Sequence, residues 1–201
     1  YKREYIIKDA VFDYTAVNLV AATEQAGFIA VLHAVNRSDE TDQNGFLVRF
    51  TPSGQQLWRR AYRPGIPNKL SGLVPVDDTS YIAVGRIRLD DGRMAGWAMK
   101  LGFDGAVQWQ RTYPRGRFSI FHDAALSPSQ SADGHGFFLS GDSVPYDEGS
   151  EAAWIMEVNA RGEPLWQRYY RRPDYDLNGR WVRAHEDGRV VLTINADAVE
   201  G

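Results

Sequence analysis

The residues of this sequence best suited to bind a ligand are arginines that follow each of three similar segments. They are Arg63, Arg115, Arg117, Arg171 and Arg172, with Tyr175 just after the last pair. A guanidinium group carries a permanent charge and parallel N–H groups that match a carboxylate or a phosphate. These side chains are therefore candidates for recognising a carboxylated, phosphorylated or protein ligand.

Acidic residues occupy segments that alternate with these arginines along the chain. The candidates are Asp39, Asp42, Asp142 and Asp147. The stretch from Asp39 to Gly45 is rich in oxygen ligands. It lacks the alternate-residue spacing of a calcium loop, so we interpret it as a solvated loop.

No segment has the spacing of a catalytic or metal-binding motif. The four histidines are scattered, and none fits a pattern such as His-Glu-x-x-His. The run Gly141-Asp142-Ser143-Val144 has the residue order of an esterase nucleophile block, but no histidine at a suitable spacing accompanies it. We therefore predict no catalytic, cofactor-binding or metal-binding residue and no bound cofactor.

The bulk composition is that of a folded domain. The 201 residues are 43% hydrophobic and 12% aromatic, with a net charge of -3, which excludes general disorder and gives no electrostatic support for nucleic-acid binding. Cysteine is absent, which excludes disulfides, thiolate zinc sites and thiol catalysis. No apolar run approaches the roughly 18 residues that a membrane span needs.

The elements that must position the candidate residues are repeated along the chain. The repeated aromatic residues are Trp58, Trp109, Trp166, Tyr62, Tyr113 and Tyr170. The tryptophans are 51 and 57 residues apart, and the tyrosines keep the same intervals. In each copy the tryptophan strand follows a four-residue turn that ends in glycine, which indicates a hairpin. Residues four apart share one face of a strand, so we interpret these aromatic residues as packing between repeated sheets.

Each repeat accommodates four strands, the size of a β-propeller blade. The predicted blades span 10–62, 70–113 and 120–170; the outer strand of an earlier blade falls at 1–8, and the first two strands of a later blade fall at 179–196. We expect an all-β fold in which 1–201 is a single region of four-stranded antiparallel blades. Two arrangements remain open. Either the strand at 1–8 completes the last blade of a four-bladed ring, or further blades from the same or another chain close a larger ring, which is favoured because rings usually have about four to eight blades.

A family resemblance supports this interpretation. The run Asp-Gly-His-Gly-Phe-Phe-Leu-Ser-Gly-Asp-Ser at 133–143 precedes Trp154-Ile155-Met156-Glu157-Val158 and a glycine turn before Trp166. This order resembles bacterial β-propeller repeats that run from a Gly-Gly-Tyr strand through a Trp-x-x-Lys-Leu strand and a glycine turn to tryptophan. It is similar, more distantly, to the quinoprotein-type (PQQ-like) repeat. The resemblance covers nearly the whole chain and implies a binding or scaffolding role, with an extracellular or periplasmic location favoured.

The loops between blades and those between second and third strands should emerge on one face of the sheets, where binding residues usually lie. We predict a non-catalytic binding or scaffolding module that recognises a protein partner or a small polar ligand through this loop face. The alternative is a propeller enzyme, quinoprotein-like or glycan-active, in which Asp39, Asp142 and Asp147 would converge on the ring axis. A third hypothesis, a structural spacer, predicts no functional face.

Overall fold

The computed structural model describes residues 12–23, 27–63, 66–131, 134–146 and 149–199, and these residues confirm the all-β expectation. The first meander contains β1 (Phe12–Thr23), β2 (Gly27–Asn36), β3 (Asp39–Phe50) and β4 (Gln56–Ala61). The second contains β5 (Asn68–Asp77), β6 (Ser80–Arg88), β7 (Met94–Gly102) and β8 (Val107–Tyr113). The third contains β9 (Phe118–Ser131), β10 (Gly134–Val144), β11 (Ala152–Val158) and β12 (Pro164–Tyr170). A hairpin of β13 (Tyr175–Ala184) and β14 (Val190–Ala198) follows.

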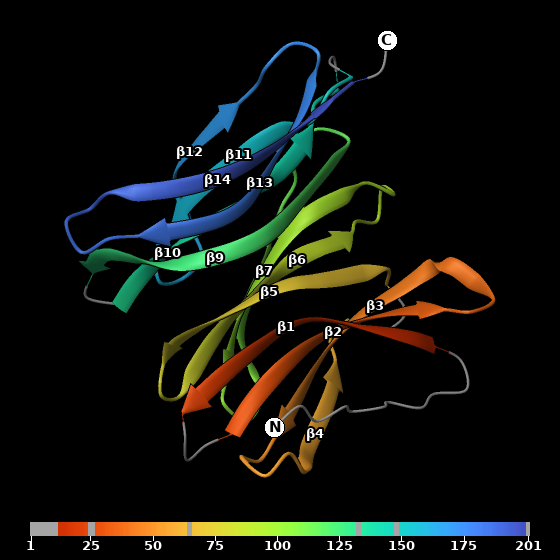
Figure 1. Cartoon of the computed structure of the whole chain (residues 1–201), viewed down its shortest axis with the longest axis vertical. Coiled ribbons are helices and arrows are strands. Elements are labelled where there is room, and N and C mark those ends of the chain that lie inside the picture. Colours follow the sequence, from red (N-terminus) through yellow and green to blue (C-terminus); the bar gives the residue numbers. More distant parts are fainter. Residues whose placement is uncertain (1–11, 24–26, 64–65, 132–133, 147–148, 200–201) are drawn as a thin grey trace.

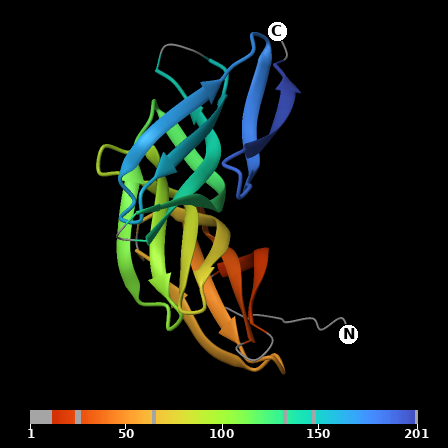
Figure 2. The same cartoon turned by 90° about the vertical axis from the view of Figure 1, so that its left-hand side faces the viewer.

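Within each meander the strands pair antiparallel in chain order. One parallel bridge, between Met94 of β7 and Phe118 of β9, also joins the second and third meanders. Strand β9 contacts both β5 and β13, and each of these three is the first strand of its meander or hairpin. The meanders therefore follow one another along a curve, with the hairpin at one end and β1 to β4 at the other (Figures 1 and 2).

The strands extend beyond the limits predicted from the sequence. The first strand of each later unit begins at Asn68, Phe118 or Tyr175 rather than at 70, 120 or 179. For β5 and β9 the physical reason lies in the side chains of Asn68 and Ser119, which accept hydrogen bonds from the backbone N–H groups of Gly45 and Gly96 in the preceding meander. The strand predicted at 1–8 lies outside the described residues.

The buried surface lies between successive meanders, since the middle strands are covered on both faces. All seven residues of β11 are buried. One core cluster between the first two meanders is built around Tyr81, Trp97 and Met99, and the next is built around Phe121 and Trp154. Strands β4 and β8 expose most of their residues, as expected for the outermost strand of a sheet.

The repeated tyrosines join each meander to the next in the same way. The Tyr62 hydroxyl donates to the Gly105 carbonyl at 3.0 Å, and the Tyr113 hydroxyl donates to the Gly162 carbonyl at 2.7 Å. Both glycines end the turn between the third and fourth strands and have positive φ angles of 81° and 76°, a conformation that glycine adopts without a steric penalty. The Trp109 indole adds a hydrogen bond to the Ala160 carbonyl at 3.0 Å.

Because these phenol groups are buried, we predict that the folded protein loses stability in alkali. Burial raises the pKa of Tyr62 to about 12, so the folded state favours its neutral form. The stability this residue contributes is present below pH 10 and is lost as the pH rises toward 12, by an amount on the order of 2 kcal/mol. Urea unfolding of the wild type between pH 9 and 12 should show this loss, and Tyr62→Phe should show a smaller pH dependence. Equal slopes for the two proteins would contradict the prediction.

Candidate functional site

Loops from neighbouring meanders meet at one end of the strands. The Arg93 guanidinium, in the loop between β6 and β7, donates to the Gly116 carbonyl in the loop between β8 and β9 at 3.4 Å. The same guanidinium donates to the Tyr146 hydroxyl in the loop after β10. The backbone N–H of Arg117 donates to the backbone carbonyl of Val144 at 2.9 Å. These contacts place the loops between meanders beside the loops between second and third strands, as the sequence predicted.

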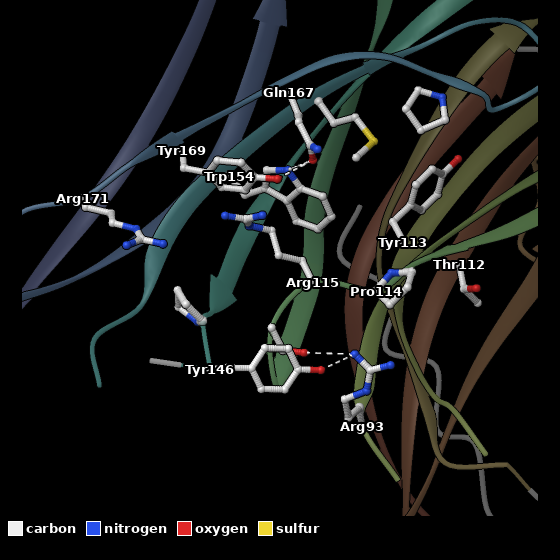
Figure 3. A pocket seen from close by; sticks show the side chains of 14 residues that line it. Arg93, Thr112, Tyr113, Pro114, Arg115, Tyr146, Trp154, Gln167, Tyr169 and Arg171 are labelled. Carbon is white, nitrogen blue, oxygen red and sulfur yellow. Dashed lines mark hydrogen bonds between the residues drawn. The ribbon is translucent and has the colours of Figure 1, made fainter. Parts of the chain in front are cut away.

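A groove of about 670 Å³ opens at this end, between β8 and the strands β11 and β12 (Figure 3). Two of the predicted arginines, Arg115 and Arg171, line it. Arg93 and Tyr146 contribute from the neighbouring loops, and Trp154 from β11 lies at its base. The groove therefore combines three guanidinium groups with aromatic walls.

Arg115 is held in this groove by stacking. Its guanidinium carbon lies 3.4 Å from the centroid of the Tyr169 ring, and that ring stacks on Trp154 with centroids 6.1 Å apart. The Tyr169 hydroxyl and the Trp154 indole both donate to the Gln167 side-chain oxygen, which fixes the two rings. Burial raises the pKa of Tyr169, although the charge of Arg115 acts in the opposite direction.

The buried Nε atom of Arg115 has no hydrogen-bond partner among the described residues. A buried donor without an acceptor costs free energy, so a ligand oxygen that accepted from it would be favoured. Arg93 differs, because its guanidinium already holds Asp91 with contacts of 2.7 and 2.8 Å. Arg115 therefore has a donor that the described residues leave without an acceptor and that is available to a ligand.

The preceding pair of meanders has a smaller counterpart of this groove, of about 220 Å³. Arg63 and Trp97 line it, together with Thr112. Thr112 is opposite Trp97 in its ladder, just as Tyr169 is opposite Trp154. Because threonine offers no ring on which an arginine can stack, Arg63 does not repeat the arrangement of Arg115.

The remaining basic candidates lie outside the large groove. The guanidinium carbon of Arg172 lies 4.2 Å from the centroid of the Tyr175 ring, so these two residues pair with each other. Arg117 is exposed in the loop before β9. Tyr175 begins β13 and is half-buried, so its assignment to a loop was wrong.

The placement of the acidic candidates on open loops was wrong where the structure describes them. Asp142 lies within β10, is 2% exposed and forms a hydrogen bond with the His122 ring. Asp39 and Asp42 belong to β3, because β2 and β3 continue to a tight turn at residues 37–38. Asp39 accepts hydrogen bonds from Thr41, two residues further along β3. Asp147 lies outside the described residues.

The structure also contains an acidic group around Glu151 that was not predicted from the sequence. Glu151 accepts a hydrogen bond from the Asn178 side chain at 2.9 Å, and its backbone N–H donates to Asp176 at 2.6 Å. Burial, followed by the charge of Asp142, raises the pKa of Glu151. Within the described ranges, no three histidine or acidic side chains are grouped so that they could hold a metal ion.

Tyr169 and Trp154 were not predicted as binding residues from the sequence, and neither were Arg93 and Tyr146. One feature of the sequence distinguishes Tyr169 from the equivalent positions in the other repeats. The position before each repeated tyrosine is Ala61, then Thr112, then Tyr169. A residue that changes while its repeated neighbours stay constant is not required by packing between repeats, and it can serve a local function.

Comparison with known proteins adds no family assignment. A scan against models of protein families found no match, and a search of curated proteins found no similar sequence. The part of the chain that the structure describes has no helix with the length and apolar character to cross a bilayer.

Proposed function

We propose that this chain forms part of a β-propeller of four-stranded blades, related to the bacterial propeller repeats that its sequence resembles. The equivalent hydrogen bonds of Tyr62 and Tyr113 support this proposal, because they show the same contact used twice between successive sheets. The curved succession of sheets in Figure 2 supports it as well. Propellers are built by such radial repetition of one sheet.

The exposed face of β12 supports a ring with further blades. Tyr170 is 42% exposed, whereas the equivalent Tyr62 and Tyr113 are each 6% exposed. Trp166 is 38% exposed, whereas the equivalent Trp58 and Trp109 are half-buried. A groove of about 560 Å³ lies between this face and β14, with Leu192 and Ile194 on its other side. Strand β14 has β13 as its only hydrogen-bonded neighbour among the described strands. A third and a fourth strand of the same repeat, added to β14, would fill this groove and supply a turn glycine for Tyr170.

On this scaffold we propose a non-catalytic function, the binding of an acidic segment of a protein partner at the Arg115 groove. The observation that carries the proposal is the buried, unpartnered Nε of Arg115 beside the Tyr169 ring. A carboxylate is the natural acceptor for such a donor. The half-open groove, with Arg93 and Arg171 near Arg115, suits an extended acidic peptide.

Fluorescence anisotropy with a labelled hexaglutamate peptide tests this function. We expect Arg115→Gln to weaken binding roughly tenfold or more, because a charge-assisted hydrogen bond contributes about 1.5–3 kcal/mol. Arg189→Gln is the matched control. It removes an exposed arginine that pairs with Asp187 in the turn between β13 and β14, away from the groove. Equal affinities of the two variants would overturn the proposal, and so would equal binding of hexalysine by the wild type.

A further inference from the structure

Two cations face each other where β5 and β6 pair. Lys69 and Arg86 are directly opposite in this ladder, so their side chains leave the same face of the sheet. Like charges at such a position destabilise a sheet. The Lys69 ammonium makes no hydrogen bond or ion pair with the residues that the structure describes. Arg86 donates one side-chain hydrogen bond, to the Gln43 amide oxygen at 3.2 Å.

A third cation comes from β13. The β13–β14 ladder is irregular between Gly179 and Trp181, which makes Arg180 the extra residue of a bulge. Strands β5 and β9 have comparable irregularities at Ser71 and His122. A bulge turns its side chain away from the regular strand direction. The Arg180 Nε atom is buried and has no hydrogen-bond partner among the described residues.

The three cations influence one another across the meanders. Burial lowers the pKa of Lys69, and the charges of Arg86 and Arg180 lower it further. Strand β9 follows β5 and contacts both β5 and β13. The charge of Arg180 therefore acts on Lys69 although the two residues belong to strands of different meanders.

His33 of β2 lies at the edge of this group. Its Nε2 atom is buried without a hydrogen-bond partner in the described part of the chain. Burial lowers the pKa of His33, and the charges of Lys69 and Arg86 also lower it. The acidic group that acts on the cluster is Asp142, which attracts Arg86 and is itself hydrogen-bonded to His122. Among the described residues, Asp142 acts on Arg86, whereas the charges that act on Lys69 are both positive, which leaves a positive local field at Lys69.

We propose that Lys69, Arg86 and Arg180 form a binding site for a small tetrahedral oxyanion such as inorganic phosphate. A bound oxyanion accepts from the orphan Nε of Arg180 and from the Lys69 ammonium, and its charge converts the mutual repulsion of the cations into attraction. The site lies at the same end of the strands as the Arg115 groove but consists of different residues. It does not depend on the function proposed for that groove.

Inorganic phosphate is the probe for this site. Added to the chain in a chloride buffer of equal ionic strength, phosphate at about ten times its dissociation constant should raise the melting temperature by roughly 3 °C. The imidazole signals of His33 should titrate at higher pH in phosphate, since the anion offsets the charges that lower its pKa.

The Lys69→Gln variant distinguishes a cluster that binds a ligand from a cluster that only stabilises the fold. Without phosphate, this variant should melt at or above the wild-type temperature because one repulsive charge is gone, and it should lose most of the response to phosphate. Arg115→Gln, the matched control at the Arg115 groove, should keep the full response. The proposal is overturned if Lys69→Gln keeps the wild-type response, if it melts well below the wild type without phosphate, or if phosphate leaves the His33 titration unchanged.

Discussion

Replacing Gly141 with alanine is expected to destabilise the protein by about 3 kcal/mol or more. An alanine Cβ atom there would lie 1.8 Å from the carbonyl oxygen of Ile120 in β9. That atom belongs to the backbone of a paired strand and cannot rotate away as a side chain can. The same conflict exists at Gly85, whose added Cβ would lie 1.9 Å from the Lys69 carbonyl oxygen. The close approach of first and second strands therefore requires glycine at both positions.

Urea unfolding followed by circular dichroism measures this effect. Gly149→Ala is the matched control, since an added Cβ atom at Gly149 has no atom within 4 Å. The control should change the free energy of unfolding by less than about 0.5 kcal/mol. Equal unfolding midpoints for Gly141→Ala and Gly149→Ala would show that the two strands lie further apart in solution than in the structure.

The sequence predicted the strands well because their signals are local. A glycine turn followed by tryptophan and tyrosine at fixed spacing marks the outer hairpins, and β8 and β12 lie where this pattern placed them. The hydrogen bonds of Tyr62 and Tyr113 agree with the interpretation of the repeated aromatic residues as packing between sheets. Strand ends were less accurate, since Asn68 and Ser119 are tied to the preceding sheet by contacts that no local pattern reveals.

The candidate sites could be predicted only in part. Arg115 and Arg171 were identified from residue type and loop position, and the structure brings them to one groove. Asp142 was misplaced because β10 continues past it, and polar residues near a strand end look the same in sequence whether they are buried or exposed. The electrostatic influence of Arg180 on Lys69 could not be predicted from the sequence, since it depends on how separate meanders stack.

Trp154→Ala is expected to destabilise the protein by about 4 kcal/mol. Trp154 is 1% exposed, and its ring stacks on Phe121 with centroids 4.6 Å apart. Removing it leaves a cavity between the second and third meanders and removes the hydrogen bond from its indole to Gln167. Trp181→Ala is the control for the same change at a side chain that is 58% exposed, and it should cost about 1 kcal/mol or less. Similar losses in urea unfolding for the two variants would contradict the prediction.

A more conservative substitution of Trp154 distinguishes its contribution to the stability of the fold from its contribution to binding at the Arg115 groove. Trp154→Phe keeps a ring against Phe121 but cannot donate to Gln167, so Tyr169 loses part of what fixes it beneath Arg115. This variant should stay folded, with a cost of about 1–2 kcal/mol, and should bind hexaglutamate more weakly than the wild type. Wild-type affinity in a folded Trp154→Phe variant would mean that Arg115 needs no support from the aromatic stack. Weaker binding would show that the residue that packs two meanders together also positions the cation that recognises the partner.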